Sequence, residues 1–250
     1  MIQAITERTG ILVNSKGLEK LETANIFVAG CGGVGSFVIE ALARAGVGKL
    51  TIIDMDIVDP SNINRQLIAL HSTVGKPKVE VMNDRILDIN PKCQVNAMQT
   101  FINSENTYSL LTAEKYDYVI DAIDTLNAKV NLVKASHELG IKTISSMGAG
   151  GKTDPTQIKV ADVYKTDVCA LARAMRTRLK KQKVKKGIKT IYSTEKGIAP
   201  LPPKEPQPNQ QGRSRATNGT LSYMPSLFGL TIAGIVIKEI VGDDFNSYTS

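Results

Sequence analysis

The feature that most constrains this chain is a glycine-rich turn that joins a short apolar run to a helical pattern. The apolar run, residues 25–30, closes in the motif Gly30-Cys31-Gly32-Gly33-Val34-Gly35. From residue 33 to 45 the apolar side chains recur at the spacing of an amphipathic helix. Bare backbone at such a turn lets a phosphate reach the amide N–H groups of the helix N-terminus. The motif therefore predicts a phosphate- or nucleotide-binding turn, with tight strand–helix packing as the alternative.

Short apolar runs and helical patterns continue to alternate over the first 150 residues. We expect further strands at 49–56, 94–102, 116–124 and 142–147, and helices at 78–89, 104–112 and 126–139. Strands that alternate with helices indicate a parallel sheet covered on both faces. The predicted fold class is α/β, with a doubly wound, Rossmann-like, mainly parallel sheet and a C-terminal extension.

The extension contains several distinct segments. A strand is predicted at 158–164, a basic helix at 167–183 and a weaker strand at 190–193. Residues 198–218 contain five prolines, which predicts a long flexible loop. Residues 221–241 are apolar, but the uncharged stretch is interrupted by Pro225 and is short for a membrane span. We expect a buried helix that packs back on the sheet.

Charged side chains follow the predicted strands where a nucleotide would bind. Asp54 ends the second strand, where an acidic residue binds a ribose, and alone it would favour NAD. Arg65 and Lys78 favour ATP instead, because cations stabilise the charge that develops on departing pyrophosphate. Asp124 ends the fourth strand and is placed to hold Mg²⁺. For each residue taken singly, a solvated loop charge is the alternative.

Four segments together resemble one family. They are the glycine motif, Asp54-Met-Asp56-x-Val-Asp-x-Ser-Asn62-x-Asn-Arg65-Gln66, Gly75-Lys-Pro-Lys78 and Asp121-Ala-Ile-Asp124. Over nearly the whole chain they resemble the adenylating domain of the ubiquitin-activating-enzyme superfamily. The resemblance implies an ATP-binding adenylating domain in residues 1–166, with residues 167–250 packed on the same domain.

The same resemblance implies roles for individual residues. Gly33 would lie against the nucleotide, and Asp54 would hold the ATP ribose. Phosphates would be contacted by Asn62, Arg65 and Lys78, and magnesium would be bound by Asp124. These last three are the expected catalytic residues, and ATP and Mg²⁺ are the expected cofactors. The full set implied to bind ATP is Gly30, Gly32, Gly33, Gly35, Asp54, Asp56, Asn62, Arg65, Gln66, Lys78 and Asp124.

The spacing of the cysteines distinguishes between two groups of enzymes in the superfamily, which act on different substrates. Cys31, Cys93 and Cys169 form no C-x-x-C pair, whereas relatives that activate sulfur-carrier proteins usually hold zinc through two such pairs. Residues 148–158 and 193–195, with the basic helix, resemble the tRNA threonylcarbamoyladenosine dehydratases instead. That resemblance implies adenylation of the threonyl carboxylate, then ring closure with release of AMP. One alternative is adenylation of the C-terminus of a ubiquitin-like or sulfur-carrier protein. The other is a non-catalytic nucleotide-binding scaffold that docks RNA or a cysteine desulfurase.

Positive charge is concentrated in one stretch. Nine basic residues and no acidic ones lie between residues 173 and 189, whereas the whole chain has a formal net charge of +7. A polyanion would neutralise their mutual repulsion, and a solvated helix face is the alternative. We expect the anticodon loop of tRNA to bind here, through Arg173, Arg176, Arg178, Lys180, Lys181, Lys183, Lys185 and Lys186.

Partners and compartment follow from weaker signals. The chain starts without the basic-then-apolar layout of a signal peptide, so a cytoplasmic enzyme without a membrane partner is expected. The resemblance implies a homodimer, in which Arg8 would reach the nucleotide across the interface. A cysteine desulfurase or another sulfur acceptor is the further partner considered.

Overall fold

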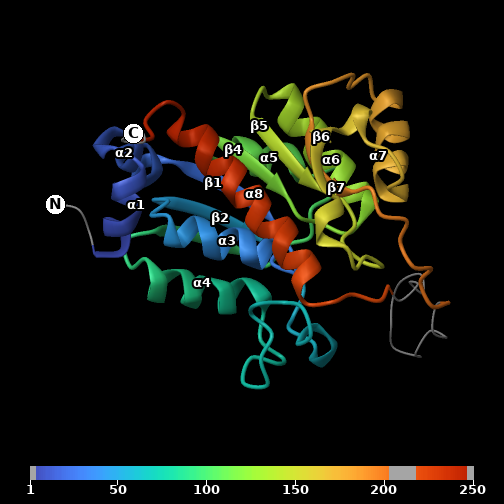
Figure 1. Ribbon diagram of the computed structural model, residues 1–250, viewed down its shortest axis with the longest axis horizontal. Coiled ribbons are helices and arrows are strands. Elements are labelled where there is room, and N and C mark those ends of the chain that lie inside the picture. The colour runs from blue at the N-terminus through green and yellow to red at the C-terminus, as the bar shows by residue number, and fades with distance from the viewer. Residues whose placement is uncertain (1–3, 203–217, 247–250) are drawn as a thin grey trace.

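The computed structural model describes residues 4–202 and 218–246. These residues form a seven-stranded sheet of order β3-β2-β1-β4-β5-β7-β6 (Figure 1). All neighbouring strands pair in parallel except β6 and β7, which are antiparallel. The strands are β1 (Asn25–Ala29), β2 (Lys49–Ile53), β3 (Gln94–Met98), β4 (Tyr118–Asp121), β5 (Lys142–Ser146), β6 (Ile158–Asp162) and β7 (Lys189–Ser193).

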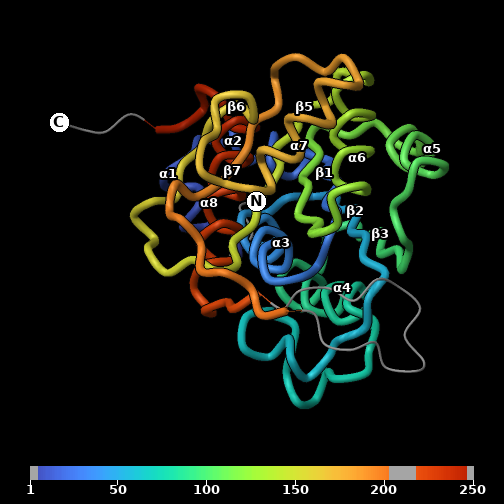
Figure 2. Tube along the Cα trace, turned by 90° about the vertical axis from the view of Figure 1, so that its right-hand side faces the viewer, coloured from blue at the N-terminus to red at the C-terminus, as the bar shows by residue number. Residues whose placement is uncertain are grey.

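Helices cover both faces of the sheet. One face carries α3 (Gly35–Arg44), α4 (Lys78–Ile89) and α8 (Tyr223–Val241), and the other carries α5 (Thr107–Thr112), α6 (Leu126–Glu138) and α7 (Ala170–Lys181). Figure 2 shows α3 and α8 on one side of β1, with α5 and α6 on the other. The predicted doubly wound α/β fold is therefore confirmed.

Strand β1 shows how the two faces are built. Ile26 and Val28 belong to the core cluster that includes α3 and α8, whereas Phe27 and Ala29 belong to the cluster under α6. Successive side chains point to opposite faces of a strand. A strand buried on both faces is therefore apolar along most of its length, which explains the apolar run Ile26–Ala29 that follows Asn25.

Several predicted strands end earlier than their apolar pattern suggests, and two of them, 49–56 and 116–124, concern the nucleotide motifs. The expected strand 49–56 ends at Ile53. Directly after it, the Asp54 carboxylate accepts hydrogen bonds from the backbone N–H groups of Cys31 and Asp56. The expected strand 116–124 likewise ends at Asp121. Both shortened ends place an acidic side chain at the carboxyl edge of the sheet.

Helix α8 is the apolar C-terminal helix predicted from the sequence. Met224, Phe228, Ile232 and Val236 on one side of it are fully buried. Gly229 permits close packing on α3, since an added Cβ would lie only 2.5 Å from the Val34 carbonyl oxygen. By length and composition this 19-residue helix could cross a membrane, but its buried side contributes to the main core.

An ion-pair network fixes α3 against α4. Glu40 lies on α3, and its carboxylate accepts from Arg85 Nε of α4 at 2.6 Å and from Arg44 Nε at 2.8 Å. Burial raises the pKa of Glu40, but its hydrogen bonds with Arg85 and Arg44 outweigh burial and leave the pKa below its ordinary value.

The N-terminal segment adds two helices that the sequence patterns did not indicate, α1 (Glu7–Leu12) and α2 (Ser15–Thr23). Helix α2 packs on α8, and Lys20 forms an ion pair with Asp244 at 2.5 Å. Both ends of the described chain therefore lie on the same side of the molecule (Figure 1).

Candidate functional site

The motifs predicted to bind a nucleotide meet at the carboxyl ends of three neighbouring strands. The glycine turn follows β1, Asp54 follows β2, and the turn that ends in Asp124 follows β4. Because β1 pairs with both β2 and β4, these three segments are adjacent. The strand order reverses between β1 and β4, and open α/β sheets bind ligands at such a switch point.

The four motif glycines serve different purposes. Gly30 has a φ of +97°, and Gly35 comes so close to it that an added Cβ would lie 1.7 Å from the Gly30 carbonyl oxygen. Gly33 faces Pro225 at the start of α8. At Gly32 the nearest atom to an added Cβ would be Gln66 Nε2, at 3.7 Å. Packing alone therefore requires Gly30 and Gly35, whereas Gly32 leaves room beside the backbone.

Asp54 is held in place by two backbone N–H groups. Its Oδ2 accepts from Cys31 N at 2.7 Å and its Oδ1 accepts from Asp56 N at 2.9 Å. Burial raises the pKa of Asp54, and the nearby Lys78 ammonium opposes that rise. Burial, with the Asp54 carboxylate next, also raises the pKa of the Cys31 thiol well above its ordinary value. Cys31 is therefore a packed residue of the glycine turn and not a thiolate.

Lys78 lies at the start of α4 and forms an ion pair with Asp56, at 2.8 Å from Nζ to Oδ2. Only 6% of the lysine side chain is exposed, compared with 58% of the aspartate side chain. Lys78 therefore lies in the wall of the site, with the Asp56 carboxylate between its ammonium and the solvent.

The segment that contains Asn62, Arg65 and Gln66 folds as a tight loop before α4. The amide oxygen of Asn62 accepts from Asp59 N and completes a capping box around a 3₁₀ turn, Pro60–Asn62. The guanidinium of Arg65 donates to the Ser61 carbonyl at 2.8 Å. Gln66 is buried, and its Oε1 has no hydrogen-bond partner in the described structure.

Asp124 lies exposed at the end of the turn that follows β4. Its Oδ1 accepts from the Thr125 hydroxyl at 3.1 Å. The turn presses against the glycine loop, because an added Cβ on Gly30 would lie 2.7 Å from the Ala122 carbonyl oxygen. Asp124 follows this contact by two residues, so its backbone lies near the glycine turn.

The sequence analysis assigned no role to two residues beneath this turn: Asp121, which stands in a family motif, and Lys129, which stands in none. Asp121 and Lys129 form an ion pair at 2.7 Å in which both side chains are 0% exposed. A signal was present, because Lys129 interrupts the apolar face of the predicted helix 126–139. Periodicity alone cannot tell whether such a lysine points to the core or to solvent.

Two further segments singled out by their sequence also meet in the fold. The Glu195 carboxylate accepts from Thr153 N at 2.9 Å and from Asp154 N at 2.9 Å. Those backbone donors, first from Asp154 and then from Thr153, lower the pKa of Glu195. The loop after β5 is therefore held against the loop after β7 at the same edge of the sheet.

The basic side chains of residues 173–189 fall into two groups, those that point toward the protein and those that are exposed to solvent. Arg176 points inward and donates to the Thr166 carbonyl at 2.9 Å, and Lys189 forms an ion pair with Glu239 of α8. Arg178 donates to the amide oxygen of Asn127, in the first turn of α6. The exposed members are Arg173, Arg178, Lys180, Lys181, Lys183, Lys185 and Lys186.

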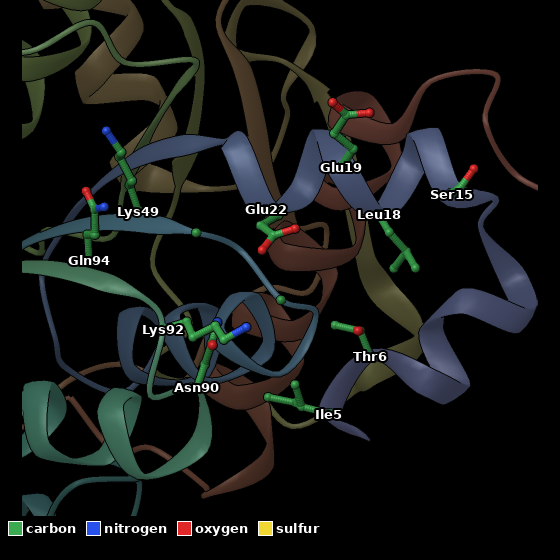
Figure 3. A pocket seen from close by; sticks show the side chains of 12 residues that line it. Ile5, Thr6, Ser15, Leu18, Glu19, Glu22, Lys49, Asn90, Lys92 and Gln94 are labelled. Carbon is green, nitrogen blue, oxygen red and sulfur yellow. The ribbon is translucent and has the colours of Figure 1, made fainter. Parts of the chain in front are cut away.

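A cavity of about 450 Å³ lies at the opposite edge of the sheet (Figure 3). Its lining includes Thr6 and Glu22, together with Lys49 and Gln94, the first residues of β2 and β3. It contains no residue of the predicted nucleotide site and lies at the amino ends of these strands.

Comparison with known proteins agrees with this geometry. The ThiF family profile matches residues 7–250. The tRNA threonylcarbamoyladenosine dehydratase of Bacillus subtilis (strain 168) is 42% identical over 243 residues, which cover 94% of each chain. The enzyme of that name from Escherichia coli (strain K12) is 42% identical over 199 residues, covering 77% of this chain and 74% of the relative.

Solved structures extend the similarity to three dimensions. The crystal structure of the E. coli tRNA N6-threonylcarbamoyladenosine dehydratase TcdA in complex with ATP has a TM-score of 0.81 and 36% identity, over 94% of this chain and 91% of that one. The structure titled TcdA (CsdL) has a TM-score of 0.83 and 37% identity, over 93% and 92%. The resemblance predicted from the motifs is confirmed, and the chain belongs to the ThiF family.

Proposed function

We propose that this chain is an ATP-dependent adenylating enzyme that dehydrates N6-threonylcarbamoyladenosine in tRNA to its cyclic form. The relatives that match most of its length carry that name. One observation in the fold supports the RNA substrate. Arg178 of the basic helix α7 contacts Asn127, three residues after Asp124, so the positive segment adjoins the edge where ATP would bind.

The reaction would proceed in two steps. A carboxylate oxygen of the threonyl group attacks the α-phosphorus of ATP, and the bond to the bridging oxygen breaks and releases pyrophosphate. The carbamoyl group then attacks the activated carbonyl carbon, one of its N–H groups loses its proton, and the bond from that carbon to the AMP oxygen breaks and releases AMP. Because this nucleophile is already part of the substrate, no enzyme cysteine has to form a thioester.

Residues at the nucleotide edge would bind ATP as follows. The Asp54 carboxylate, oriented by its two backbone donors, would accept hydrogen bonds from the ribose hydroxyls. The open backbone at Gly32 would face the phosphates. Lys78 can exchange its Asp56 partner for a phosphate oxygen, because the Asp56 carboxylate is 58% exposed and readily solvated. Arg65 would approach the phosphates from the neighbouring loop. The unpartnered Gln66 Oε1 leaves an acceptor at the base of the glycine turn.

Magnesium would be held by Asp124. Within residues 4–202 and 218–246 no group of three or more His, Cys, Asp or Glu side chains could hold a metal. A single carboxylate fits Mg²⁺, which proteins commonly bind through one or two carboxylates, substrate phosphates and water. When bound, the ion would neutralise charge on the phosphates.

The exposed basic residues on α7 and in the following turn would contact tRNA phosphates around the anticodon loop. Arg176 is the exception in the predicted set, because its guanidinium already supports the segment before α7. We therefore assign residues 1–166 to nucleotide binding and residues 167–250 to positioning RNA and completing the sheet.

We also propose a cytoplasmic homodimer. Helix α1, which carries Arg8, follows the segment that lines the cavity at the amino edge of β2 and β3. Arg8 therefore lies at the wrong edge to serve the nucleotide site of its own chain and would serve that of a second copy. Light scattering would test the dimer, and mixing Arg8→Ala with Asp124→Asn subunits would test the exchange.

The proposed reaction can be tested with purified components. The protein is incubated with ATP, Mg²⁺ and tRNA that carries threonylcarbamoyladenosine, with unmodified tRNA and a carrier protein ending in Gly-Gly as controls. We expect AMP and the cyclic nucleoside in equal amounts from modified tRNA alone. AMP formation that depends on the carrier protein would establish the alternative adenylation reaction. ATP binding without turnover on any substrate would indicate a scaffold.

A further inference from the structure

The core contains a charged pair that no nucleotide contact explains. The Lys129 Nζ of α6 lies 2.7 Å from the Asp121 Oδ2 at the end of β4, and both side chains are 0% exposed. Removing two charges from water is costly, and well-packed apolar residues often stabilise a core as well as such a pair does. Stability alone therefore does not account for this pair, and its neighbours indicate what else it does.

Each member of the pair also bonds to a second part of the carboxyl edge. Lys129 Nζ donates to the carbonyl of Ser146, the last residue of β5, at 2.7 Å. Asp121 Oδ2 accepts from the Ser145 hydroxyl at 2.5 Å. Asp121 Oδ1 accepts from Ile123 N at 3.1 Å, inside the turn. The pair thus ties together the ends of two strands and the turn between β4 and α6.

That turn carries the side chain proposed to hold magnesium. It begins at Asp121, ends at Asp124, and presses on Gly30 of the glycine loop through the Ala122 carbonyl. Helix α6, which carries Lys129, begins at Leu126, directly after the turn. The buried Lys129 ammonium therefore holds the turn through Asp121, and Gly30 of the glycine loop packs against the turn at Ala122.

We propose that Lys129 is a positioning residue for adenylation: through Asp121 it fixes the turn 121–124 so that the Asp124 carboxylate is held where it would bind Mg²⁺. This inference rests on the proposed function, in which Asp124 holds Mg²⁺. It assigns to Lys129 no contact with ATP or RNA. Its effect should therefore appear in the contribution of Mg²⁺ to nucleotide binding and not in nucleotide binding itself.

The test uses the full-length protein and three variants. Lys129→Met removes the ammonium, and Asp121→Asn/Lys129→Met removes both charges, so that no carboxylate is left buried alone. Lys134→Met is the matched control, because Lys134 lies on the same helix but forms a partly exposed ion pair with Glu138. Calorimetry measures the affinity for AMP, for ATP with chelator and for ATP with Mg²⁺, and pyrophosphate release gives the Mg²⁺ activation constant.

We expect the double variant to bind AMP and metal-free ATP like the parent. Its Mg²⁺ activation constant should rise by about 10- to 100-fold, the usual cost of removing a residue that orients a metal ligand. Lys134→Met should match the parent in every measurement. A merely structural role would lower the active fraction and leave the Mg²⁺ constant unchanged.

The outcomes separate the inference from the proposed function. If the parent dehydrates tRNA and responds to Mg²⁺, and the double variant has the same Mg²⁺ constant, the positioning role is wrong and the function stands. If Lys129→Met fails to fold, the double variant decides by the same comparison. If Mg²⁺ does not strengthen ATP binding by the parent, the assignment of Asp124 fails and the inference fails with it.

Discussion

Replacing the five exposed lysines of the basic segment should weaken tRNA binding and flatten its dependence on salt. The changes are Lys180, Lys181, Lys183, Lys185 and Lys186 to Ala, and all five side chains are exposed. Each phosphate neutralised on a single strand contributes about 0.7 to the slope of log affinity against log salt, so five contacts contribute about 3.5. Between 50 and 200 mM salt the parent should therefore lose roughly 100-fold more affinity than the variant.

A second five-lysine variant separates local contacts from net charge. Its changes lie outside residues 173–189, mostly at the amino edge of the sheet, and lower the formal charge of +7 by the same five units: Lys16, Lys49, Lys92, Lys115 and Lys142 to Ala. Lys142 lies near Lys189, but Lys189 is paired with Glu239 and is not one of the exposed basic residues. This control should keep the parent's salt slope. Neither variant should change ATP affinity, since the proposed ATP contacts lie in residues 30–124.

Fluorescence anisotropy with labelled tRNA across a salt series measures both slopes, and the KM for tRNA gives an independent reading under turnover. Equal slopes for the parent and the basic-segment variant would show that the segment is only a solvated helix face. Equal loss in both five-lysine variants would show that RNA responds to overall charge and not to this surface.

The remaining predictions concern the nucleotide edge and the core. Asp124→Asn should abolish pyrophosphate release while the melting temperature stays near that of the parent, because the side chain is exposed; near-parental release would refute the magnesium assignment. Gly229→Ala should destabilise the fold by about 1–3 kcal/mol in urea denaturation through overpacking against α3. Gly234→Ala is its control, with nothing within 4 Å of the added Cβ, and should be neutral or stabilising by up to about 1 kcal/mol. Because the pKa of Glu40 is lowered in the fold, its contribution to stability is present above the unfolded value of 4.5 and is lost as pH falls below it; thermal melts should show this loss, and Glu40→Gln should reduce it.

The sequence was most informative where local chemistry and global packing agree. The apolar runs Ile26–Ala29 of β1 and Tyr118–Ile120 of β4 indicated strands buried on both faces, and the glycine turn after β1 indicated that a helix follows. Helix α4 begins and ends at the predicted residues, 78 and 89, because Pro77 precedes it and Asn90-Pro91 follows it. These signals each depend on a few neighbouring residues.

Other features depend on contacts between distant segments, which one sequence does not reveal. The insertion of β7 between β5 and β6 is one example, since its residues were only weakly strand-like. The partners of the site cations are another, because the ion pair of Lys78 with Asp56 and the inward direction of Arg176 arise from three-dimensional packing. The sequence was enough to name the motif residues at the carboxyl edge of the sheet. It did not show which of those residues bond to other residues of the protein.

The C-terminal extension also takes part in the nucleotide edge, and this links the two halves of the proposed reaction. The Thr220 carbonyl, just before α8, accepts from Asn64 at 3.0 Å, and Pro225 faces Gly33. The Tyr223 hydroxyl donates to the Thr153 carbonyl at 2.7 Å, in the loop after β5. The start of α8 therefore contacts the glycine turn, the loop before α4 and the loop after β5 at once. RNA bound to α7 and ATP bound at the glycine turn would therefore be held by connected parts of one fold, which would favour a fixed geometry between the carboxylate and ATP.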